Sequence, residues 1–307
     1  MSIESDFIWF DGEMVPFDQA NVHVLSHTLH YGLGVFEGIR AYQQPDGSAG
    51  VWRLREHLRR FVDSLKMMYT DCPYTVDDLE KACVDTINTN KFSAAYIRPL
   101  AFLGHGQMGL GARGNRTHVI VATWHWGAYL GDDGLNNGVD LGTSTFTRNH
   151  PNSMLQRAKV VGHYVNSIMA RYEANENGFD EAVMLDQNGY VAEGTGENIF
   201  VVQDGVITTP PVANILPGIT RQTVLEIAAE RGMEVKEQFF GRDALYAADE
   251  AFMCGTAAEV TPIRSLDRRT VGNGTPGPIT KAVQKDYLDG VRGKVPYLEK
   301  HITRCRS

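Results

Sequence analysis

The sequence predicts a protein of mixed α/β and α+β class, organised in two domains. Its 307 residues exceed the usual size of one domain. Hydrophobic residues make up 43% of the chain and charged residues 21%, which is typical of a compact globular protein and not of a disordered or coiled-coil one. Signals for antiparallel strands and for amphipathic helices both recur along the chain, so neither all-α nor all-β architecture fits.

Three turn dipeptides predict β-hairpins. Asp11-Gly12, Asn188-Gly189 and Asp204-Gly205 each separate two apolar, strand-like segments. These residue pairs accept the left-handed backbone that a two-residue hairpin turn requires. The apolar run 118–126 is too short to span a bilayer and predicts a buried strand.

Helix signals lie between these strands. Apolar residues at helical spacing predict a helix over about residues 58–68. Thr75 followed by Val-Asp-Asp is typical of a capping box and predicts the start of the next helix. A third helix is expected from about Thr220 to a stop at Gly232, because glycine accepts the backbone that ends a helix.

A domain boundary is expected near the middle of the chain. The segment GAYLGDDGLNNG, residues 127–138, combines glycines with Asp and Asn directly after a strand-like run. We therefore expect a smaller N-terminal domain over residues 1–127, a linker over 128–137 and a larger domain over 138–307.

Composition excludes several classes of function. Lys and Arg number 29 against 37 Asp and Glu, and the net charge of −8 repels a nucleic-acid backbone. The N-terminus has acids where a signal peptide needs basic residues, so we do not expect secretion, and the most apolar run is too short to span a membrane. The four cysteines include no C-x-x-C, so we expect a reduced protein of the cytoplasm.

Two motifs are weaker than they look. Residues 104–109 match G-x-G-x-x-G, but the following LGARGNRT has no helical periodicity, so a flexible loop is expected in place of a dinucleotide fold. His23, His27 and His30 could share a helical face, yet HVLSH lacks the Glu of H-E-x-x-H. We interpret these histidines as packing and capping residues and expect no metal.

Lys159 and Glu193 are the first candidates for chemistry. Lys159 is the only lysine between Lys91 and Lys236, and apolar residues follow it. A partly buried amine loses proton affinity and becomes a usable nucleophile for a Schiff base. The alternative is that Lys159 simply extends to solvent from the start of a helix. Glu193 ends an apolar hairpin strand beside glycines, where it could hold a protonated pyridine nitrogen or merely cap the turn.

Two further turns suit an anion. In LPGITR, residues 216–221, a glycine turn leads into a helix and exposes the amides of Ile219 and Thr220, although a plain helix start is the alternative. In CGTAAE, residues 254–259, a strand ends in glycine and the Thr256 hydroxyl. A lone lysine, an acid on a strand and two anion-binding turns are together the protein groups that pyridoxal phosphate requires.

With these residues in place, the chain resembles the fold type IV pyridoxal-phosphate enzymes, and among them the branched-chain amino acid aminotransferases. The resemblance covers nearly the whole chain in order. Its motifs are HYGLGVFEGIRAY (30–42), REHLRRF (55–61), AYIRP (95–99), WGAYLG (126–131), Lys159, EGTGENIF (193–200), LPGITR (216–221) and GTAAEVTP (255–262). It implies a two-domain, fold type IV transaminase architecture with the cofactor between the domains.

The resemblance implies roles for individual residues toward pyridoxal 5′-phosphate. Lys159 would form the Schiff base and then move a proton between the substrate's α carbon and the cofactor. Glu193 would pair with the pyridine nitrogen, and Tyr164 would hydrogen-bond near O3′. Of the two arginines in EHLRR, Arg59 and Arg60, the alignment favours Arg60 as a phosphate ligand. The other cofactor-binding residues implied are Gly196, Glu197, Asn198, Leu216, Gly218, Ile219, Thr220 and Thr256.

A substrate pocket is also implied. The α-carboxylate would rest on the turn of Thr256, Ala257 and Ala258, and aromatic side chains would shield an aliphatic side chain from water. Arg98 with Tyr96 would receive the distal carboxylate of glutamate or 2-oxoglutarate, because guanidinium pairs well with carboxylate. The other substrate-binding residues implied are Phe36, Arg40, Trp126 and Tyr129, with Tyr31 and Leu110 from the neighbouring subunit.

The function implied is ping-pong transfer of the amino group from L-leucine, L-isoleucine or L-valine to 2-oxoglutarate, as in branched-chain amino acid biosynthesis. The partners implied are amino acids, 2-oxo acids and a second subunit, in a homodimer at minimum or a hexamer. The alternatives within the fold are a D-amino acid aminotransferase, an (R)-amine transaminase and aminodeoxychorismate lyase. A non-catalytic binding protein is the alternative from another class.

Overall fold

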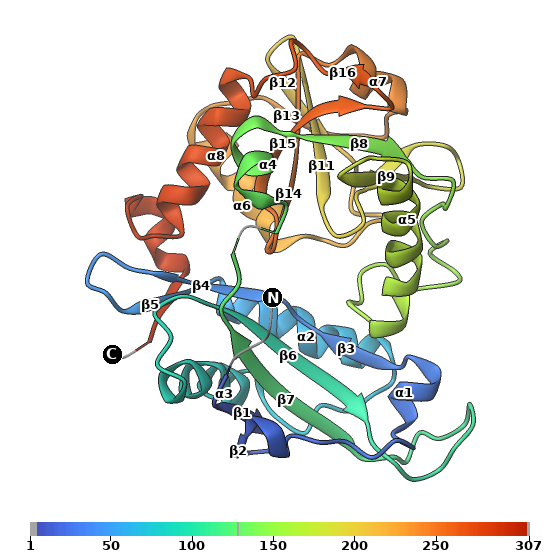
Figure 1. Cartoon of the computed structure of the whole chain (residues 1–307), viewed down its shortest axis with the longest axis vertical. Helices are drawn as coiled ribbons and strands as arrows, with labels where there is room; N and C mark the ends of the chain where they lie inside the picture. Colours follow the sequence, from blue (N-terminus) through green and yellow to red (C-terminus); the bar gives the residue numbers. More distant parts are fainter. Residues whose placement is uncertain (1–4, 128, 306–307) are drawn as a thin grey trace. The chain divides into compact units, whose positions relative to one another are not determined.

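The computed structural model describes residues 5–127 and 129–305, which form two compact units. The first unit contains the chain up to Trp126, the short segment Ala158–His163 and the chain from Gly290 onward, and the second contains Gly127–Arg157 and Tyr164–Asp289. Figure 1 traces these segments by colour along the chain. Two later segments thus return to the first unit, which differs from the simple division at residues 128–137 expected from the sequence. Residues 131–137 of that expected linker form a helix, α4 (Gly131–Asn137).

The first unit is built on one sheet of antiparallel strands. Among the described residues its order is β17-β5-β4-β6-β7-β1-β2, and β3 also pairs with β6. Its strands are β1 (Phe7–Phe10), β2 (Glu13–Pro16), β3 (Gly34–Phe36), β4 (Ile39–Gln43), β5 (Ala49–Trp52), β6 (Ala95–Leu103), β7 (Thr117–Trp124) and β17 (Ile302–Arg304). Its helical segments are η1 (Phe17–Gln19), α1 (His27–Tyr31), α2 (Leu54–Met67), α3 (Val76–Thr89), η2 (Val161–His163) and η3 (Pro296–His301).

Helices α2 and α3 supply the core of the first unit. Leu58, Phe61 and Leu65 recur at helical spacing on α2 and are buried in one cluster with Val35 and Ile97 of the sheet. This arrangement confirms the helix expected over residues 58–68. The capping box predicted at Thr75 is present, because the Thr75 side chain accepts from the Asp78 amide and the Asp78 carboxylate accepts from the Thr75 amide.

The second unit is built on a mixed sheet. Among the described residues the order is β10-β9-β8-β15-β14-β11-β12-β13, with β16 paired to β15, and the pairs β8/β9, β8/β15 and β12/β13 are parallel. Its strands are β8 (Val139–Thr143), β9 (Glu181–Leu185), β10 (Val191–Glu193), β11 (Asn198–Gln203), β12 (Val206–Thr209), β13 (Val235–Glu237), β14 (Glu250–Gly255), β15 (Glu259–Leu266) and β16 (Arg269–Thr270). Its remaining helices are α5 (Tyr164–Glu176), α6 (Ile219–Glu230), α7 (Arg242–Ala247) and α8 (Pro278–Gly290).

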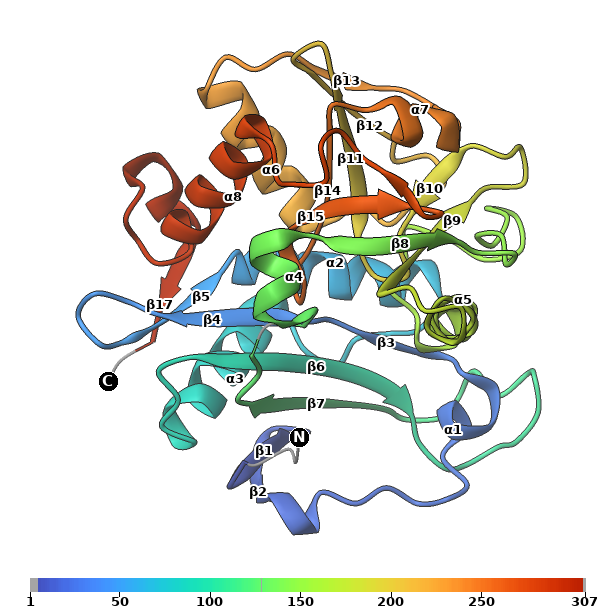
Figure 2. The same ribbon diagram turned by 45° about the horizontal axis from the view of Figure 1, so that its top comes forward.

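Strand alternation divides the packing of the second sheet between its two faces. On β9, Ala182 and Met184 cluster with Ala170 and Ala174 of α5, whereas Val183 joins a separate cluster that includes α7. Figure 2 shows α5 beside β8 and β9. The sheet is therefore covered by helices on both faces, which holds the ends of β10 and β14 in fixed positions.

The three predicted hairpins are confirmed. Antiparallel pairs β1/β2, β9/β10 and β11/β12 turn at Asp11-Gly12, Asn188-Gly189 and Asp204-Gly205. Asp11 and Gly12 both have positive φ, at 50° and 105°, as a type I′ turn requires. The predicted third helix is α6, and Gly232 adopts the left-handed backbone after it. No helix within the described part of the chain is long and apolar enough to cross a membrane.

Candidate active site

Lys159 lies in the first unit on an irregular segment that is fixed to β3 and α2. Its carbonyl accepts from the Phe36 amide at 3.1 Å, and its own amide donates to Ser64 Oγ at 3.1 Å. The amine Nζ lies 5.0 Å from the centre of the Phe36 ring. The side chain is half-buried and its segment precedes η2 and α5, so it does not extend from within a helix. Because both its amide and its carbonyl are hydrogen-bonded, the backbone of Lys159 is fixed and the side chain leaves it in a defined direction.

Arg60 is held by a buried carboxylate. Its Nε donates to Glu37 Oε1 at 2.7 Å and its guanidinium also donates to Glu37 Oε2 at 2.9 Å, while His57 Nδ1 donates to Oε2 at 2.7 Å. Burial acts to raise the pKa of Glu37, but the Arg60 guanidinium and His57 outweigh it and hold this pKa well below its usual range. Burial lowers the pKa of His57 although Glu37 acts in the opposite direction. Arg59, by contrast, is exposed.

Arg98 lies among aromatic rings. Its guanidinium carbon is 4.8 Å from the Phe36 ring centre, 5.5 Å from that of Tyr96 and 5.6 Å from that of Trp124. Its Nε is buried and has no hydrogen-bond partner among the described residues. A buried guanidinium nitrogen without a partner is costly, so the site is suited to a ligand carboxylate.

The predicted substrate residues around Arg98 are brought together. Tyr96 packs edge-on against Trp126 at a centroid distance of 4.4 Å, and Arg40 donates to the Trp126 carbonyl at 3.0 Å. A Cβ at Gly38 would lie 1.9 Å from the Tyr96 hydroxyl, so only glycine fits beside that ring. The rings of Phe36, Tyr96 and Trp124 around Arg98 form an aromatic wall, against which Trp126 packs.

Tyr31 and Leu110 lie outside this wall. Within the single chain their side chains are 43% and 92% exposed. His27 links the two segments that carry them: its ring is 4.5 Å from that of Tyr31, and its Nε2 donates to the Gly109 carbonyl at 2.9 Å. The structure therefore does not join Tyr31 and Leu110 to Arg98 in one chain.

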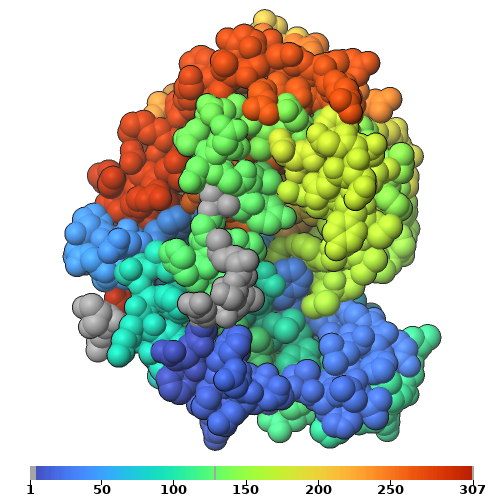
Figure 3. Space-filling model, in the orientation of Figure 1, coloured from blue at the N-terminus to red at the C-terminus, as the bar shows by residue number. Residues whose placement is uncertain are grey.

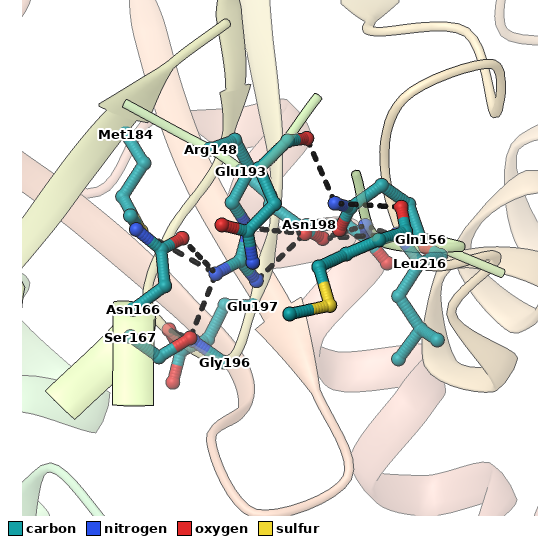
Figure 4. Close-up of polar contacts among 12 residues, drawn as sticks. Arg148, Gln156, Asn166, Ser167, Met184, Glu193, Gly196, Glu197, Asn198 and Leu216 are labelled. Atoms are coloured by element: carbon teal, nitrogen blue, oxygen red, sulfur yellow. Dashed lines mark hydrogen bonds and ion pairs between the residues drawn. The ribbon is translucent and has the colours of Figure 1, made fainter. Parts of the chain in front are cut away.

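In the second unit, Glu193 is buried at the end of β10 and is hydrogen-bonded through both carboxylate oxygens (Figure 4). Its Oε1 accepts from Arg148 Nε at 2.8 Å and lies 2.7 Å from Arg148 Nη2. Its Oε2 accepts from Asn198 Nδ2 at 3.4 Å and from the Leu216 amide at 3.3 Å. This set of donors compensates for burying the carboxylate.

The start of α6 provides amides without a side-chain cap. Gly218 is its N-cap residue, and Ile219 and Thr220 begin the helix and are buried. Asn198 fixes this turn through the Leu216 carbonyl at 3.1 Å, and a Cβ at Gly218 would lie 1.9 Å from Asn198 Oδ1. A side chain at Gly218 would therefore displace Asn198, whereas glycine leaves the first amides of the 12-residue helix open to an anion.

Two more predicted segments lie at strand and helix ends. Thr256 and Ala257 are half-buried and Ala258 is buried in the turn between β14 and β15. Tyr164 is the first residue of α5 and is half-buried. Tyr129 is 38% exposed, and the guanidinium carbon of Arg171 lies 5.8 Å from its ring centre.

Glu197 is a second buried acid beside Glu193. Its Oε2 accepts from the Gly196 amide at 3.0 Å. Burial, together with the negative charge of Glu181, raises the pKa of Glu197 to about 8. The group is therefore protonated at neutral pH and adds no charge next to Glu193.

The expectations for residues 104–109 and the histidines are tested by the same structure. Residues 104–109 form a loop with no helix after them, as predicted. His27 and His30 lie on α1 but His23 lies before it, where its ring is 5.1 Å from that of His105. Within residues 5–127 and 129–305, no group of three or more His, Cys, Asp or Glu could hold a metal ion.

Sequence reasoning missed three residues of these networks, namely Arg148, Glu37 and His57. Arg148 stands in the sequence TRNH, which matches no motif. Glu37 and His57 lie within the segments FEGIRAY and REHLRRF, but nothing in either segment identifies a partner in the other. A buried charge next to glycine, as in FEG, is the only local signal.

The fold and these residues define an aminotransferase of class IV. The sequence profile of the family "Amino-transferase class IV" matches residues 34–266, more than half of the chain. The chain belongs to this family.

Its relatives are branched-chain-amino-acid aminotransferases. That of Pseudomonas aeruginosa is 51% identical over 294 residues, covering 96% of this chain and 95% of the relative. The crystal structure of the Escherichia coli branched-chain amino acid aminotransferase has a TM-score of 0.96 at 44% identity and covers 99% of this chain and 100% of its own. That of the Thermobaculum terrenum enzyme, in its PLP form, has a TM-score of 0.93 at 33% identity and covers 100% of both chains. Mixed helices and two sheets agree with the fold type IV architecture that the sequence predicted.

Proposed function

We propose that this protein transfers the amino group of L-leucine, L-isoleucine or L-valine to 2-oxoglutarate, with pyridoxal 5′-phosphate as cofactor. The observation that carries the proposal is the position of Arg98 within the aromatic wall of Phe36, Tyr96 and Trp124. The aromatic faces suit an aliphatic side chain, and the guanidinium suits the distal carboxylate of glutamate or 2-oxoglutarate. One pocket can therefore serve both substrates of a ping-pong reaction.

The residues present fit the cofactor. The crystal structure of the Thermobaculum terrenum relative is that of its PLP form. Here the uncapped start of α6 and the Arg60 guanidinium offer donors for a phosphate, and the Glu193 carboxylate offers an acceptor for a protonated pyridine nitrogen. Lys159 provides a half-buried amine whose backbone is fixed. These are the groups that the cofactor requires.

Each residue then has a defined task. Bound pyridoxal phosphate supplies an aldehyde that condenses with amines and a ring that withdraws electrons from the α carbon. Lys159 Nζ would hold the cofactor and move the proton at the substrate's α carbon. Glu193 would accept from the ring nitrogen, and Tyr164 would donate near O3′. The turn Thr256–Ala258 binds the substrate α-carboxylate.

We also propose that the working unit is at least a homodimer in the cytoplasm. Val165, Ile168, Met169 and Tyr172 form an apolar stripe on α5, and all four are more than 40% exposed. Figure 3 shows the surface of this segment in yellow-green. Tyr31 and Leu110 are exposed as well, as expected for residues that complete a neighbour's pocket. The four cysteines are free, which suits a reducing compartment.

The test is the first half of the reaction. The purified holoenzyme is mixed separately with L-leucine, D-alanine and (R)-1-phenylethylamine, and the absorption of the bound cofactor is followed. Rapid conversion to the pyridoxamine form with L-leucine is the expected result. Conversion mainly with D-alanine or with the amine would assign the protein to another activity of the same fold.

The matched control compares two lysine variants. Lys159→Ala is expected to abolish turnover while cofactor still binds noncovalently. Lys81→Ala removes a lysine that is 77% exposed in a surface pair with Asp85 and should leave turnover unchanged. Near-normal turnover of the Lys159 variant would refute the proposal.

A further inference from the structure

Arg148 is the charged partner of Glu193, and no motif identifies it. It lies in the loop between β8 and α5, and its side chain is 12% exposed. Both its Nε and its Nη2 contact Glu193 Oε1, at 2.8 and 2.7 Å. The donors on Oε2 are neutral and longer, at 3.4 Å from Asn198 and 3.3 Å from the Leu216 amide. Arg148 is therefore the strongest partner of this buried carboxylate.

The same guanidinium also contacts α5. Arg148 Nη1 donates to Ser167 Oγ at 2.7 Å and to Asn166 Oδ1 at 3.4 Å (Figure 4). Asn166 in turn donates to the Thr147 carbonyl at 3.0 Å. The first turn of α5, which begins at Tyr164, is thus fastened to the Arg148 loop. One side chain connects the end of β10 with the start of α5.

The backbone of Arg148 is fixed too. Its amide donates to the Leu185 carbonyl of β9 at 2.8 Å, and its carbonyl accepts from the Gln187 side chain. Because the backbone of Arg148 is fixed, its guanidinium can hold the residues that it contacts in a defined position.

The charge of Arg148 matters because the carboxylate is buried. Glu193 is 3% exposed, and a carboxylate at that depth is stable only when paired. The other acid beside it, Glu197, has a raised pKa of about 8 and is held by the Gly196 amide. Of the described groups that donate to Glu193, Arg148 is the cation, so its loss would remove the charged partner of this buried carboxylate.

We propose that Arg148 is a positioning residue for the cofactor ring. It holds the Glu193 carboxylate in the direction proposed for the pyridine nitrogen, and it fixes the first turn of α5, which begins at Tyr164. This inference rests on the proposed function, which assigns Glu193 and Tyr164 to the cofactor. It adds a residue that touches neither cofactor nor substrate.

The test measures cofactor binding and the cofactor spectrum in Arg148→Gln and Arg148→Lys. Apoprotein is titrated with pyridoxal phosphate, and the absorption of the bound cofactor is recorded across pH. We expect Arg148→Gln to weaken binding by about 10- to 100-fold, as for a lost charge-assisted contact, and to move the pH midpoint of the absorption band. Arg148→Lys keeps the charge and should recover the wild-type midpoint and part of the affinity.

Two controls separate positioning from a general structural role. Arg264→Gln removes a more exposed arginine–carboxylate pair, with Asp140, in the same unit, and it should change neither the affinity nor the midpoint. In a double-mutant cycle, Arg148→Gln should add little to Glu193→Gln, because both act through one contact. Circular dichroism of each variant monitors folding, and Arg148→Lys serves as the test if the glutamine variant does not fold.

The outcomes divide clearly. An Arg148→Gln protein with wild-type affinity and midpoint, or effects that add fully to those of Glu193→Gln, would overturn the positioning role and leave the proposed function intact. A wild-type protein that binds no pyridoxal phosphate would overturn the proposed function and, with it, this inference.

Discussion

Replacing Glu37 with glutamine tests whether the Arg60 network is essential to the first unit. Glu37 is fully buried and accepts from Arg60 through both oxygens and from His57 at 2.7 Å. Glutamine keeps the shape, but its amide group places a donor against these donors and removes the negative charge that pairs with Arg60. Breaking a buried pair by removing one partner costs about 3–5 kcal/mol.

The assay is urea unfolding followed by tryptophan fluorescence. Trp9, Trp52, Trp124 and Trp126 all lie in the first unit, and they are the four tryptophans of the chain, so the signal reports that unit. With a slope of about 2 kcal/mol per M urea, the expected loss lowers the midpoint by about 1.5–2.5 M. This readout does not assume that the two units unfold together.

A matched control removes an ion pair at the surface. Asp46→Asn breaks the exposed contact between Asp46 and Arg304, which is 3.4 Å long, and should not shift the midpoint measurably. If Glu37→Gln shifted the midpoint no more than this control, the reasoning that the buried carboxylate is required to hold Arg60 would be wrong.

The pH dependence of the unfolding midpoint gives a second check. Because the folded-state pKa values of both Glu37 and His57 are lowered, the stability they contribute is present above about pH 6.5 and is lost as pH falls.

Three further predictions use other parts of the chain. Glu197 has a folded-state pKa of about 8 against 4.5 in the unfolded chain, so it lowers the stability of the fold as pH rises between these values. The stability of Glu197→Gln, measured by urea unfolding with circular dichroism, should therefore rise by about 1–4 kcal/mol relative to wild type between pH 5 and pH 8.5. A stability difference that does not depend on pH would contradict this. Arg98→Leu should weaken the binding of 2-oxoglutarate by about 1.5–3 kcal/mol and that of L-leucine much less, as measured by KM in each half-reaction. Equal losses of affinity for the two substrates would count against a distal-carboxylate role. When the folded protein is treated with a thiol reagent, Cys72 should be modified first. Cys83, Cys254 and Cys305 are buried, and burial raises the pKa of each of these three thiols. Fast labelling of several thiols would disagree with the structure.

The parts of the fold that sequence reasoning predicted are those determined by neighbouring residues. A hairpin turn at Asp204-Gly205 depends on the backbone freedom of two residues, and the capping box of α3 depends on Thr75 and Asp78 alone. The return of residues 158–163 and 290–305 to the first unit depends on contacts across the chain. One is the bridge between Val35 and Val160, and another is the pairing of β17 with β5. Local patterns contain no information about such pairings.

The same limit applies to the candidate site. Lys159 could be singled out because it stands alone among arginines, and LPGITR because a glycine turn before a helix has a known electrostatic consequence. Arg148 and Glu37 could not, because each acquires its role from a partner far away in the sequence, 45 residues for Arg148 and Glu193 and 23 for Glu37 and Arg60. A charged residue that acts through another side chain cannot be identified from the sequence, because only the fold shows which two side chains are in contact.

The environments of the arginines differ with the role proposed for each. Arg60 and Arg148 each contact a carboxylate, Glu37 and Glu193, and such a fixed partner suits the positioning of a bound cofactor. Arg98 is surrounded by aromatic rings and lacks a carboxylate partner among the described residues. A permanent acid there would compete with each incoming carboxylate, whereas ring faces stabilise the cation and leave its hydrogen bonds for the substrate. An arginine that must release its ligand in every cycle is therefore held by aromatic faces, and this difference makes Arg98 the candidate for substrate recognition.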